Sequence, residues 1–127
     1  MNEDEVEVYV VNAFSEKAQK EAVSDDSLRK AAEEIVNGLI DANLSGSLVK
    51  KRIASGNRNT GRSDGNRAIV SIKRGKKLFY LYLFSKKEKD NINKKELKAL
   101  KEFGELMFSY SDEQLNDMVS KGVLRKL

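Results

Sequence analysis

The stretch GRSDGNRAIVSIKRGKKLFYLYLFSKKEKDN, residues 61–91, contains two apolar runs separated by a short cationic segment. If the first run, residues 67–72, is a strand, Ala68, Val70 and Ile72 point inward and Arg67, Ile69 and Ser71 lie on the opposite face. The second run, residues 78–84, is apolar on both faces, as expected for a central strand that is covered on both sides. Gly75 between the runs suits a hairpin turn. The stretch therefore predicts an antiparallel pair at the centre of a sheet.

A third strand is predicted upstream of this pair. If the segment LVKKRIA, residues 48–54, is extended, Lys50 and Arg52 lie on one face and Lys51 lies on the other, because side chains alternate along a strand. The polar segment 55–66 has three glycines and no core candidates, so it predicts a loop. Arg67 then opens the next strand, on the face opposite its inward-pointing apolar residues. The three strands form a predicted meander.

Two helices are predicted between a first strand, Glu5–Val11, and this meander. In the first helix apolar residues recur at four-residue spacing. In the second, Ser24 suits the N-cap and Asp25 suits the positive first turn. The apolar stripe of this second helix comprises Leu28, Ala31, Ile35 and Leu39. The segment NLSGS, residues 43–47, is expected to break the pattern before the strands begin.

The C-terminal third is predicted to be helical. Asn93 with Glu96, and Ser111 with Gln114, form capping-box patterns ahead of apolar residues at helical spacing. Gly122 is expected to end the last helix. Asp90 and Asn91 are interpreted as a turn and the start of a helix.

Length and composition favour a single domain over residues 1–127, because 127 residues with 39% hydrophobic content bury one modest core. Residues 1–5 are expected to fray, and residues 111–127 to form a C-terminal helix and tail. No apolar run approaches the roughly 18 residues of a membrane span, and the N-terminus is acidic, unlike a signal peptide. We therefore expect a cytoplasmic protein with no membrane partner.

The chain has no histidine and no cysteine. This composition removes disulfides, thiolate catalysis, the usual structural zinc sites and the commonest general base. A metal site built from Asp64 and Asp90 is disfavoured because both carboxylates lie in a cationic region. The sequence therefore predicts no metal and no cofactor.

The net charge of +4 conceals a strong asymmetry along the chain. Residues 1–47 contain four Lys or Arg and eleven Asp or Glu, a net charge of −7, which leaves +11 for residues 48–127. Within residues 48–101 there are seventeen basic and four acidic residues. Such a concentration indicates a polyanionic partner, although lysines on exposed surfaces also serve solubility alone.

Four motifs in this order resemble the RelE/ParE superfamily of bacterial and phage toxins of type II toxin–antitoxin systems, in particular its RelE-like and HigB-like members. They are LVKKRIA (48–54), GRSDGNRAIV (61–70), LFYLYLFSKKEKDNI (78–92) and KKELKALKEF (94–103). The similarity runs over most of residues 12–120. It implies an α+β fold, a small twisted antiparallel sheet with an N-terminal helical hairpin on one side, C-terminal helices, and a basic concave surface on the other side.

The resemblance also implies an activity and partners. RelE-like members cut mRNA, typically in the ribosomal A site and without a metal. The RNA 2′-hydroxyl attacks the adjacent phosphate, and fixed guanidinium groups stabilise the charge that develops on its oxygens. The expected partners are mRNA, the ribosome and a cognate antitoxin of helix-turn-helix type. The free toxin is expected to be a monomer or a weak homodimer.

By motif position, Arg67 is the expected phosphate-stabilising residue, and Lys50 and Arg52 are its expected positioning or acid–base partners. The expected RNA contacts are Arg58, Arg62, Lys86 and Lys89. The alternative for Arg67 is a strand-end arginine paired with Asp64. The alternative for the loop lysines is simple solvation.

The general base is left open between a lysine in a cluster of like charge and one of three tyrosines, Tyr80, Tyr82 and Tyr110. The position before Arg67 is usually aromatic in the superfamily, whereas this chain has Asn66. Stacking of a base at that position is therefore in question.

Two other functions share the predicted fold, so fold alone does not separate them. One is a non-catalytic ParE-like toxin that inhibits a protein such as DNA gyrase. The other is a basic RNA-binding module without toxicity.

Overall fold

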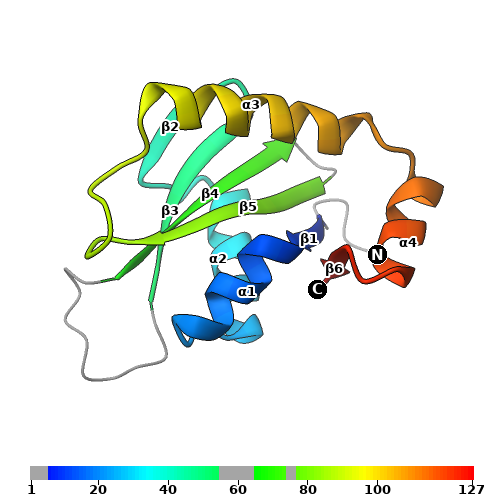
Figure 1. The fold of residues 1–127 in the computed structure, drawn as a ribbon, viewed down its shortest axis with the longest axis horizontal. Coiled ribbons are helices and arrows are strands. Elements are labelled where there is room, and N and C mark those ends of the chain that lie inside the picture. The colour runs from blue at the N-terminus through cyan, green and yellow to red at the C-terminus, as the bar shows by residue number, and fades with distance from the viewer. Residues whose placement is uncertain (1–5, 55–64, 74–76) are drawn as a thin grey trace.

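The computed structural model describes residues 6–54, 65–73 and 77–127 (Figure 1). Within these ranges the chain forms one six-stranded sheet, in the order β2-β3-β4-β5-β1-β6, and four helices. The strands are β1 (Glu7–Val11), β2 (Ala42–Ser45), β3 (Leu48–Ile53), β4 (Asn66–Lys73), β5 (Lys77–Ser85) and β6 (Leu124–Lys126). The helices are α1 (Asn12–Lys20), α2 (Asp25–Val36), α3 (Lys94–Ser109) and α4 (Asp112–Ser120).

The predicted meander is confirmed, because β3, β4 and β5 pair in antiparallel order. The apolar run of β5 is buried on both faces. Tyr80 faces α1 and α2, where its hydroxyl donates to the carbonyl of Leu28 at 2.6 Å and its ring lies 5.1 Å from that of Phe14. Phe79 faces α3, where its ring meets that of Phe108 edge-on at 5.2 Å. The central position predicted for this strand therefore holds.

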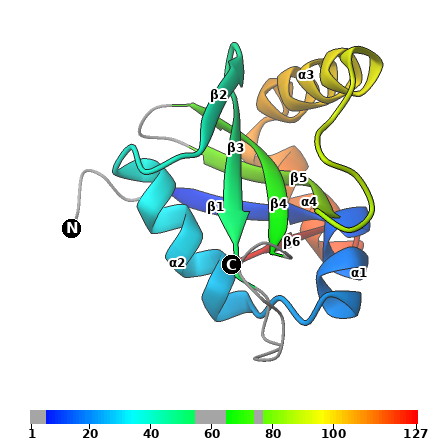
Figure 2. The same cartoon turned by 90° about the vertical axis from the view of Figure 1, so that its left-hand side faces the viewer.

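Figures 1 and 2 show α3 along one side of the sheet and α1 and α2 on the other. The approach of α3 is close, because a Cβ added at Gly104 would lie 2.6 Å from the hydroxyl oxygen of Ser71 on β4. The resemblance implied a basic concave surface on the second side of the sheet, and α3 covers part of that side.

Two edge strands lie where the sequence predicted a break and a tail. Gly46, with a positive φ of 56°, allows a tight reversal between β2 and β3, so the expected break is the turn of a hairpin. After α4 the chain returns as β6 to pair with β1, and the N–H of Leu127 donates to the carbonyl of Val8 at 2.9 Å. In addition β1 pairs in parallel with β5, so the sheet is mostly, not wholly, antiparallel.

The predicted helix starts are confirmed. Ser24 accepts a hydrogen bond from the N–H of Ser27, and both predicted capping boxes form at α3 and α4. The predicted stripe of α2 is one residue too long. The helix ends at Val36, where the N–H of Leu39 donates to the carbonyl of Glu34, and the Leu39 side chain is 59% exposed. No helix in the described ranges is long and apolar enough to cross a membrane.

Candidate functional site

The register of β3, β4 and β5 brings the three predicted catalytic cations onto one face of the sheet. Residues directly opposite each other on paired strands share a face. Arg52 on β3 lies opposite Arg67 on β4, which lies opposite Phe84 on β5. Lys50 lies opposite Ile69, which lies opposite Tyr82. These two rows, separated by one strand repeat of roughly 7 Å, form the cationic face.

Two guanidinium groups in direct cross-strand register repel each other. Among the described residues, no ion pair involves the side chain of Arg52 or Arg67. Arg67 is half-buried and donates from Nη1 to the carbonyl of Gly65 at 2.9 Å. Arg52 is exposed, and its backbone N–H is held by the carboxylate of Asp41. The face is therefore arranged to attract an anion.

An irregularity in β5 adds two aromatic side chains to this face. The register shifts between Ile69 and Val70, whose partners on β5 are Tyr82 and Tyr80, so Leu81 is an extra residue. Strict alternation would place Tyr80 and Tyr82 on the same face. The extra residue instead turns Tyr82 and Phe84 toward the cations, with their rings 5.7 Å apart. Bulges commonly redirect side chains next to functional sites in this way.

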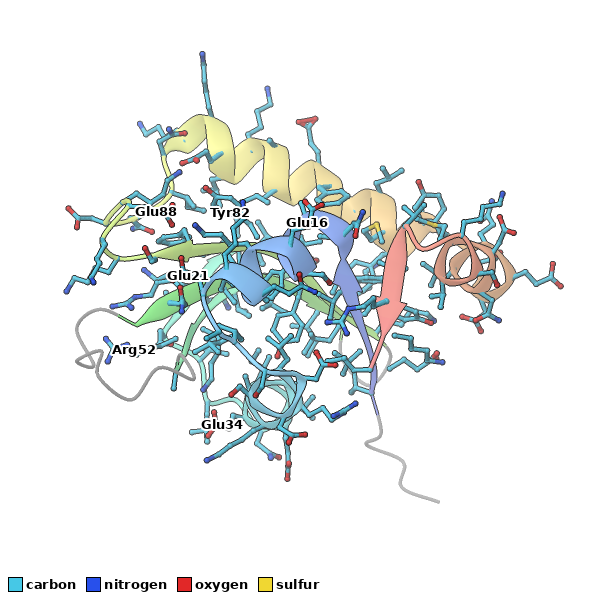
Figure 3. The ribbon with its side chains drawn as sticks, turned by 60° about the horizontal axis from the view of Figure 1, so that its bottom comes forward. Glu16, Glu21, Glu34, Arg52, Tyr82 and Glu88 are labelled. Carbon is cyan, nitrogen blue, oxygen red and sulfur yellow. The ribbon has the colours of Figure 1, made fainter. Side chains whose placement is uncertain are left out.

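The structure separates the three tyrosines that sequence left open as general base. Tyr80 is buried on the opposite face, and burial raises the pKa of its hydroxyl well above its ordinary value, so it is a poor proton acceptor. Tyr110 caps the C-terminal end of α3, where it lines an apolar pocket with Met118 and Leu124. Tyr82 is the tyrosine that lies on the cationic face. Figure 3 shows Arg52, Tyr82 and Glu88 toward the end of the sheet that lies away from α4.

The loop lysines after β5 differ from each other. Lys86 is exposed. Lys89 pairs with Glu96, the capping residue of α3, and its ammonium lies 5.3 Å from the centre of the Tyr82 ring. Hydrogen bonding to the Glu96 carboxylate raises the pKa of Lys89. Contact of either lysine with RNA stays a prediction. The other predicted RNA contacts, Arg58 and Arg62, lie outside the described residues, as does Asp64.

Asn66 does not stand in for the aromatic residue that the superfamily usually has at this position. It lies in the row of Ile53 and Ser85, on the face that α1 and α2 cover, and it is only 1% exposed. Its side-chain amide has no hydrogen-bond partner within the described ranges. A base cannot stack on this side chain, so any stacking must come from Tyr82 or another surface residue.

Sequence reasoning missed Glu88 and Lys17, which form an ion pair of 2.6 Å beside Tyr82. Lys17 is on α1 and Glu88 is in the loop after β5, so no local pattern connects them. Within the described ranges, no three acidic side chains come together in a way that could hold a metal ion.

Residues 6–127 match the family described as RelE toxin of the RelE / RelB toxin-antitoxin system. A comparison with curated proteins finds no match. The family match covers nearly the whole chain and confirms the resemblance carried by the four motifs. Membership implies an antitoxin partner and favours a toxin over an RNA-binding module without toxicity. The chain belongs to the RelE toxin family.

Proposed function

We propose that this toxin is an endoribonuclease that cleaves mRNA on the ribosome through attack of a 2′-hydroxyl on the adjacent phosphate. The observation that carries the proposal is the cross-strand pair Arg52 and Arg67, with Lys50 in the next row. None of the three side chains forms an ion pair with a described carboxylate. A phosphodiester is the partner class that converts this repulsion into charge-assisted hydrogen bonds. A carboxylate-rich protein segment satisfies the same charges, which suits the antitoxin.

In the proposed reaction the 2′-oxygen bonds to phosphorus and the bond from phosphorus to the 5′-oxygen breaks. The products are a 2′,3′-cyclic phosphate and a 5′-hydroxyl. Arg67 contacts the non-bridging oxygens with its planar fork and stabilises their growing charge. One group accepts the 2′-hydroxyl proton and another protonates the leaving 5′-oxygen. Lys50 and Tyr82, on either side of Ile69 in one row, are placed to divide these two roles.

The test is the loss of Arg67. We expect Arg67→Ala to lower the single-turnover cleavage rate on programmed ribosomes by on the order of 10²–10³, comparable to the loss of one oxyanion donor. Arg67→Lys should restore little, because an ammonium cannot reproduce the two-pronged contact. Lys121→Ala, on an exposed side chain beyond α4 that pairs with Asp117, is the control and should cleave like the wild type. The same mRNA without ribosomes tests ribosome dependence.

Growth arrest on induced expression separates this proposal from the ParE-like alternative. Arrest with cleaved transcripts, both lost in Arg67→Ala, supports the endoribonuclease. Arrest by the wild type with intact transcripts, or full toxicity of folded Arg67→Ala, would reject it and favour inhibition of a protein such as DNA gyrase. A translating ribosome as substrate places the proposed activity in the cytoplasm, where an antitoxin of helix-turn-helix type is the expected regulator.

A further inference from the structure

The connection between α2 and β2 contacts each of the three consecutive cations of β3. The N–H of Asp41 donates to the carbonyl of Lys50 at 2.9 Å, and the carbonyl of Leu39 accepts from the Lys51 ammonium at 2.8 Å. The carboxylate of Asp41 accepts from the N–H of Arg52 through Oδ2. Asp41 therefore holds the main chain of both β3 cations that lie on the cationic face.

Asp41 takes over from β2 as the edge partner of β3. The ladder between β2 and β3 begins with Ala42 opposite Lys50, so β2 does not reach Arg52. At that point the Asp41 carboxylate supplies the acceptor that a longer β2 would have supplied from its backbone. A carboxylate that accepts from a backbone N–H forms a charge-assisted hydrogen bond, which is roughly twice as strong as a neutral one. One side chain thus restrains the end of β3 from its outer side.

This hydrogen bond bears directly on the pair Arg52 and Arg67. Because the N–H of Arg52 points outward to Asp41, it takes no part in the ladder between β3 and β4. The two arginines therefore form a non-hydrogen-bonded pair, in which opposite Cα atoms lie only roughly 4.5 Å apart and the side chains are closest. Their guanidinium groups repel, and no hydrogen bond between their own main chains opposes that repulsion. Asp41 restrains the main chain of Arg52 instead.

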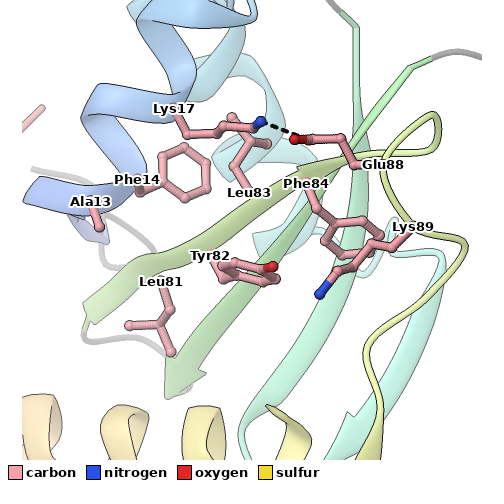
Figure 4. Close-up of a pocket in the computed structure, with 9 residues that line it drawn as sticks. All are labelled: Ala13, Phe14, Lys17, Leu81, Tyr82, Leu83, Phe84, Glu88 and Lys89. Atoms are coloured by element: carbon pink, nitrogen blue, oxygen red, sulfur yellow. Dashed lines mark ion pairs between the residues drawn. The ribbon is translucent and has the colours of Figure 1, made fainter.

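Asp41 holds this arginine without neutralising it. Its Oδ2 is engaged by the main chain, and among the described residues no ion pair includes Asp41. Glu88, a carboxylate beside Tyr82, is likewise engaged elsewhere, since it pairs with Lys17 at 2.6 Å (Figure 4). These two carboxylates therefore leave the guanidinium groups available to a phosphate.

We propose that Asp41 is a positioning residue of the endoribonuclease, which orients the Arg52 guanidinium toward the phosphate through its hydrogen bond to the Arg52 main chain. The inference rests on the proposed function. The bond fixes the N–H of Arg52 and with it the direction of the Cα–Cβ bond, so the side chain starts from one place opposite Arg67. A cation held in place in advance costs no reorganisation when charge develops on the phosphate. Asp41 acts through Arg52 and does not contact the RNA.

Asp41→Ala and Asp41→Asn separate the hydrogen bond from the charge. The asparagine amide oxygen can accept from the Arg52 N–H, whereas alanine has no acceptor. We expect Asp41→Ala to lower the single-turnover cleavage rate on programmed ribosomes on the order of tenfold, within the 10²-fold that a misplaced group can cost. Asp41→Asn should keep most of the wild-type rate, because a neutral acceptor still holds the N–H.

A double-mutant cycle assigns the effect to Arg52. Arg52→Ala removes the guanidinium but keeps the N–H, so Asp41→Ala should cause almost no further loss when it is added to Arg52→Ala. Asp26→Ala is the matched control, because Asp26 is an exposed carboxylate of α2 that accepts from Arg29 at 3.2 Å. It should cleave like the wild type. Urea denaturation of each variant corrects the rates for the folded fraction.

Each result decides between this inference and the proposed function. A wild type that cleaves no mRNA rejects the function, and the inference falls with it. If Arg67→Ala abolishes cleavage but Asp41→Ala cleaves at the wild-type rate, the function stands and the inference is overturned. Equal losses in Asp41→Ala and Asp41→Asn would assign the effect to charge, and multiplied losses in the double variant would show that Asp41 does not act through Arg52. Either result overturns the inference, as does a loss of folding in Asp41→Ala that accounts for its slower cleavage.

Discussion

The two faces of β3 use the same kind of residue for opposite purposes. On one face the Lys51 side chain is 11% exposed, pairs with Glu34 of α2 at 3.0 Å and donates to the carbonyl of Leu39 at 2.8 Å. On the other face its neighbours Lys50 and Arg52 form no ion pair with a described carboxylate. Three consecutive cations in the sequence thus divide into one that is held by the fold and two that are not.

The difference shows that pairing, more than charge count, identifies the functional cations. Lys51 forms an ion pair with Glu34 of α2 and so stabilises the packing of that helix against the sheet. Arg52 instead lies opposite Arg67, an arrangement that costs folding free energy until an anion arrives. A fold gains nothing for its own stability from that arrangement, so its presence favours a binding role for this face.

The strongest test of this comparison replaces each of the adjacent lysines, Lys50 and Lys51, with alanine in turn. Lys50→Ala should slow cleavage on the order of 10²-fold, the typical contribution of a positioned acid or base, with little effect on unfolding. Lys51→Ala should destabilise the fold and leave the cleavage rate nearly unchanged, because it leaves the Leu39 carbonyl and Glu34 without their donor. We expect a loss of about 1–2 kcal/mol in unfolding free energy. Urea denaturation and single-turnover cleavage measure the two effects.

The comparison would break if both variants lost cleavage equally while remaining folded. Cations on the two faces would then contribute to cleavage only through their net positive charge, and the face on which a cation lies would not determine its role. Equal losses of stability would instead show that Lys50 has a structural partner.

The division between the faces of β3 was predictable from sequence, because a period of two needs only the strand's position. The same reasoning placed Arg67 opposite the inward-pointing Ala68 and Val70, and the register shows that this is the face of Arg52. It failed on β5, where alternation groups Tyr80 with Tyr82. The extra residue Leu81 separates them, and an apolar run with no glycine or polar residue gives no local signal of a bulge.

Long-range pairings were equally invisible to the sequence. Lys17 meets Glu88 across 71 positions of the chain, and β6 pairs with β1 from the opposite terminus. These contacts depend on how helices and strands pack after they form, whereas caps such as Asn93 with Glu96 depend on neighbours within one turn. Capping, and strand alternation on β3 and β4, were therefore correct, and the edge strands were missed.

A second prediction sharpens the comparison through salt. Binding of an uncleavable single-stranded RNA should weaken as ionic strength rises, with a log–log slope of about −0.7 for each phosphate contacted. With three contacts, affinity should fall roughly 20-fold between 50 and 200 mM salt. Arg52→Ala should remove about 0.7 from the slope, whereas Lys51→Ala should leave it unchanged. Equal slopes for the two variants, or a flat line for the wild type, would contradict an electrostatic role of this face.

The smallest expected effect concerns the two tyrosines that the bulge places on opposite faces of β5. Tyr80 donates to the Leu28 carbonyl on the α1 and α2 side, and Tyr82 lies with the cations. Tyr80→Phe should cost about 1 kcal/mol of unfolding free energy at neutral pH, the net value of one hydrogen bond, and leave cleavage intact. Tyr82→Phe should leave unfolding nearly unchanged and slow cleavage if Tyr82 accepts or donates the proton.

The unfolding free energy at alkaline pH tests further whether Tyr80 is buried and protonated in the folded state. Burial raises the pKa of Tyr80, so the folded state keeps a proton that the unfolded chain loses near pH 10. The folded state then binds more protons than the unfolded state, and the unfolding free energy falls as pH rises above about 10. Burial also raises the pKa of Tyr9 to about 12, so Tyr80→Phe should reduce this slope without abolishing it. Urea denaturation at pH 7 and pH 10.5 measures the slope. An unchanged slope in Tyr80→Phe would mean that Tyr80 ionises normally, and Tyr80 would again compete with Tyr82 as the proton acceptor.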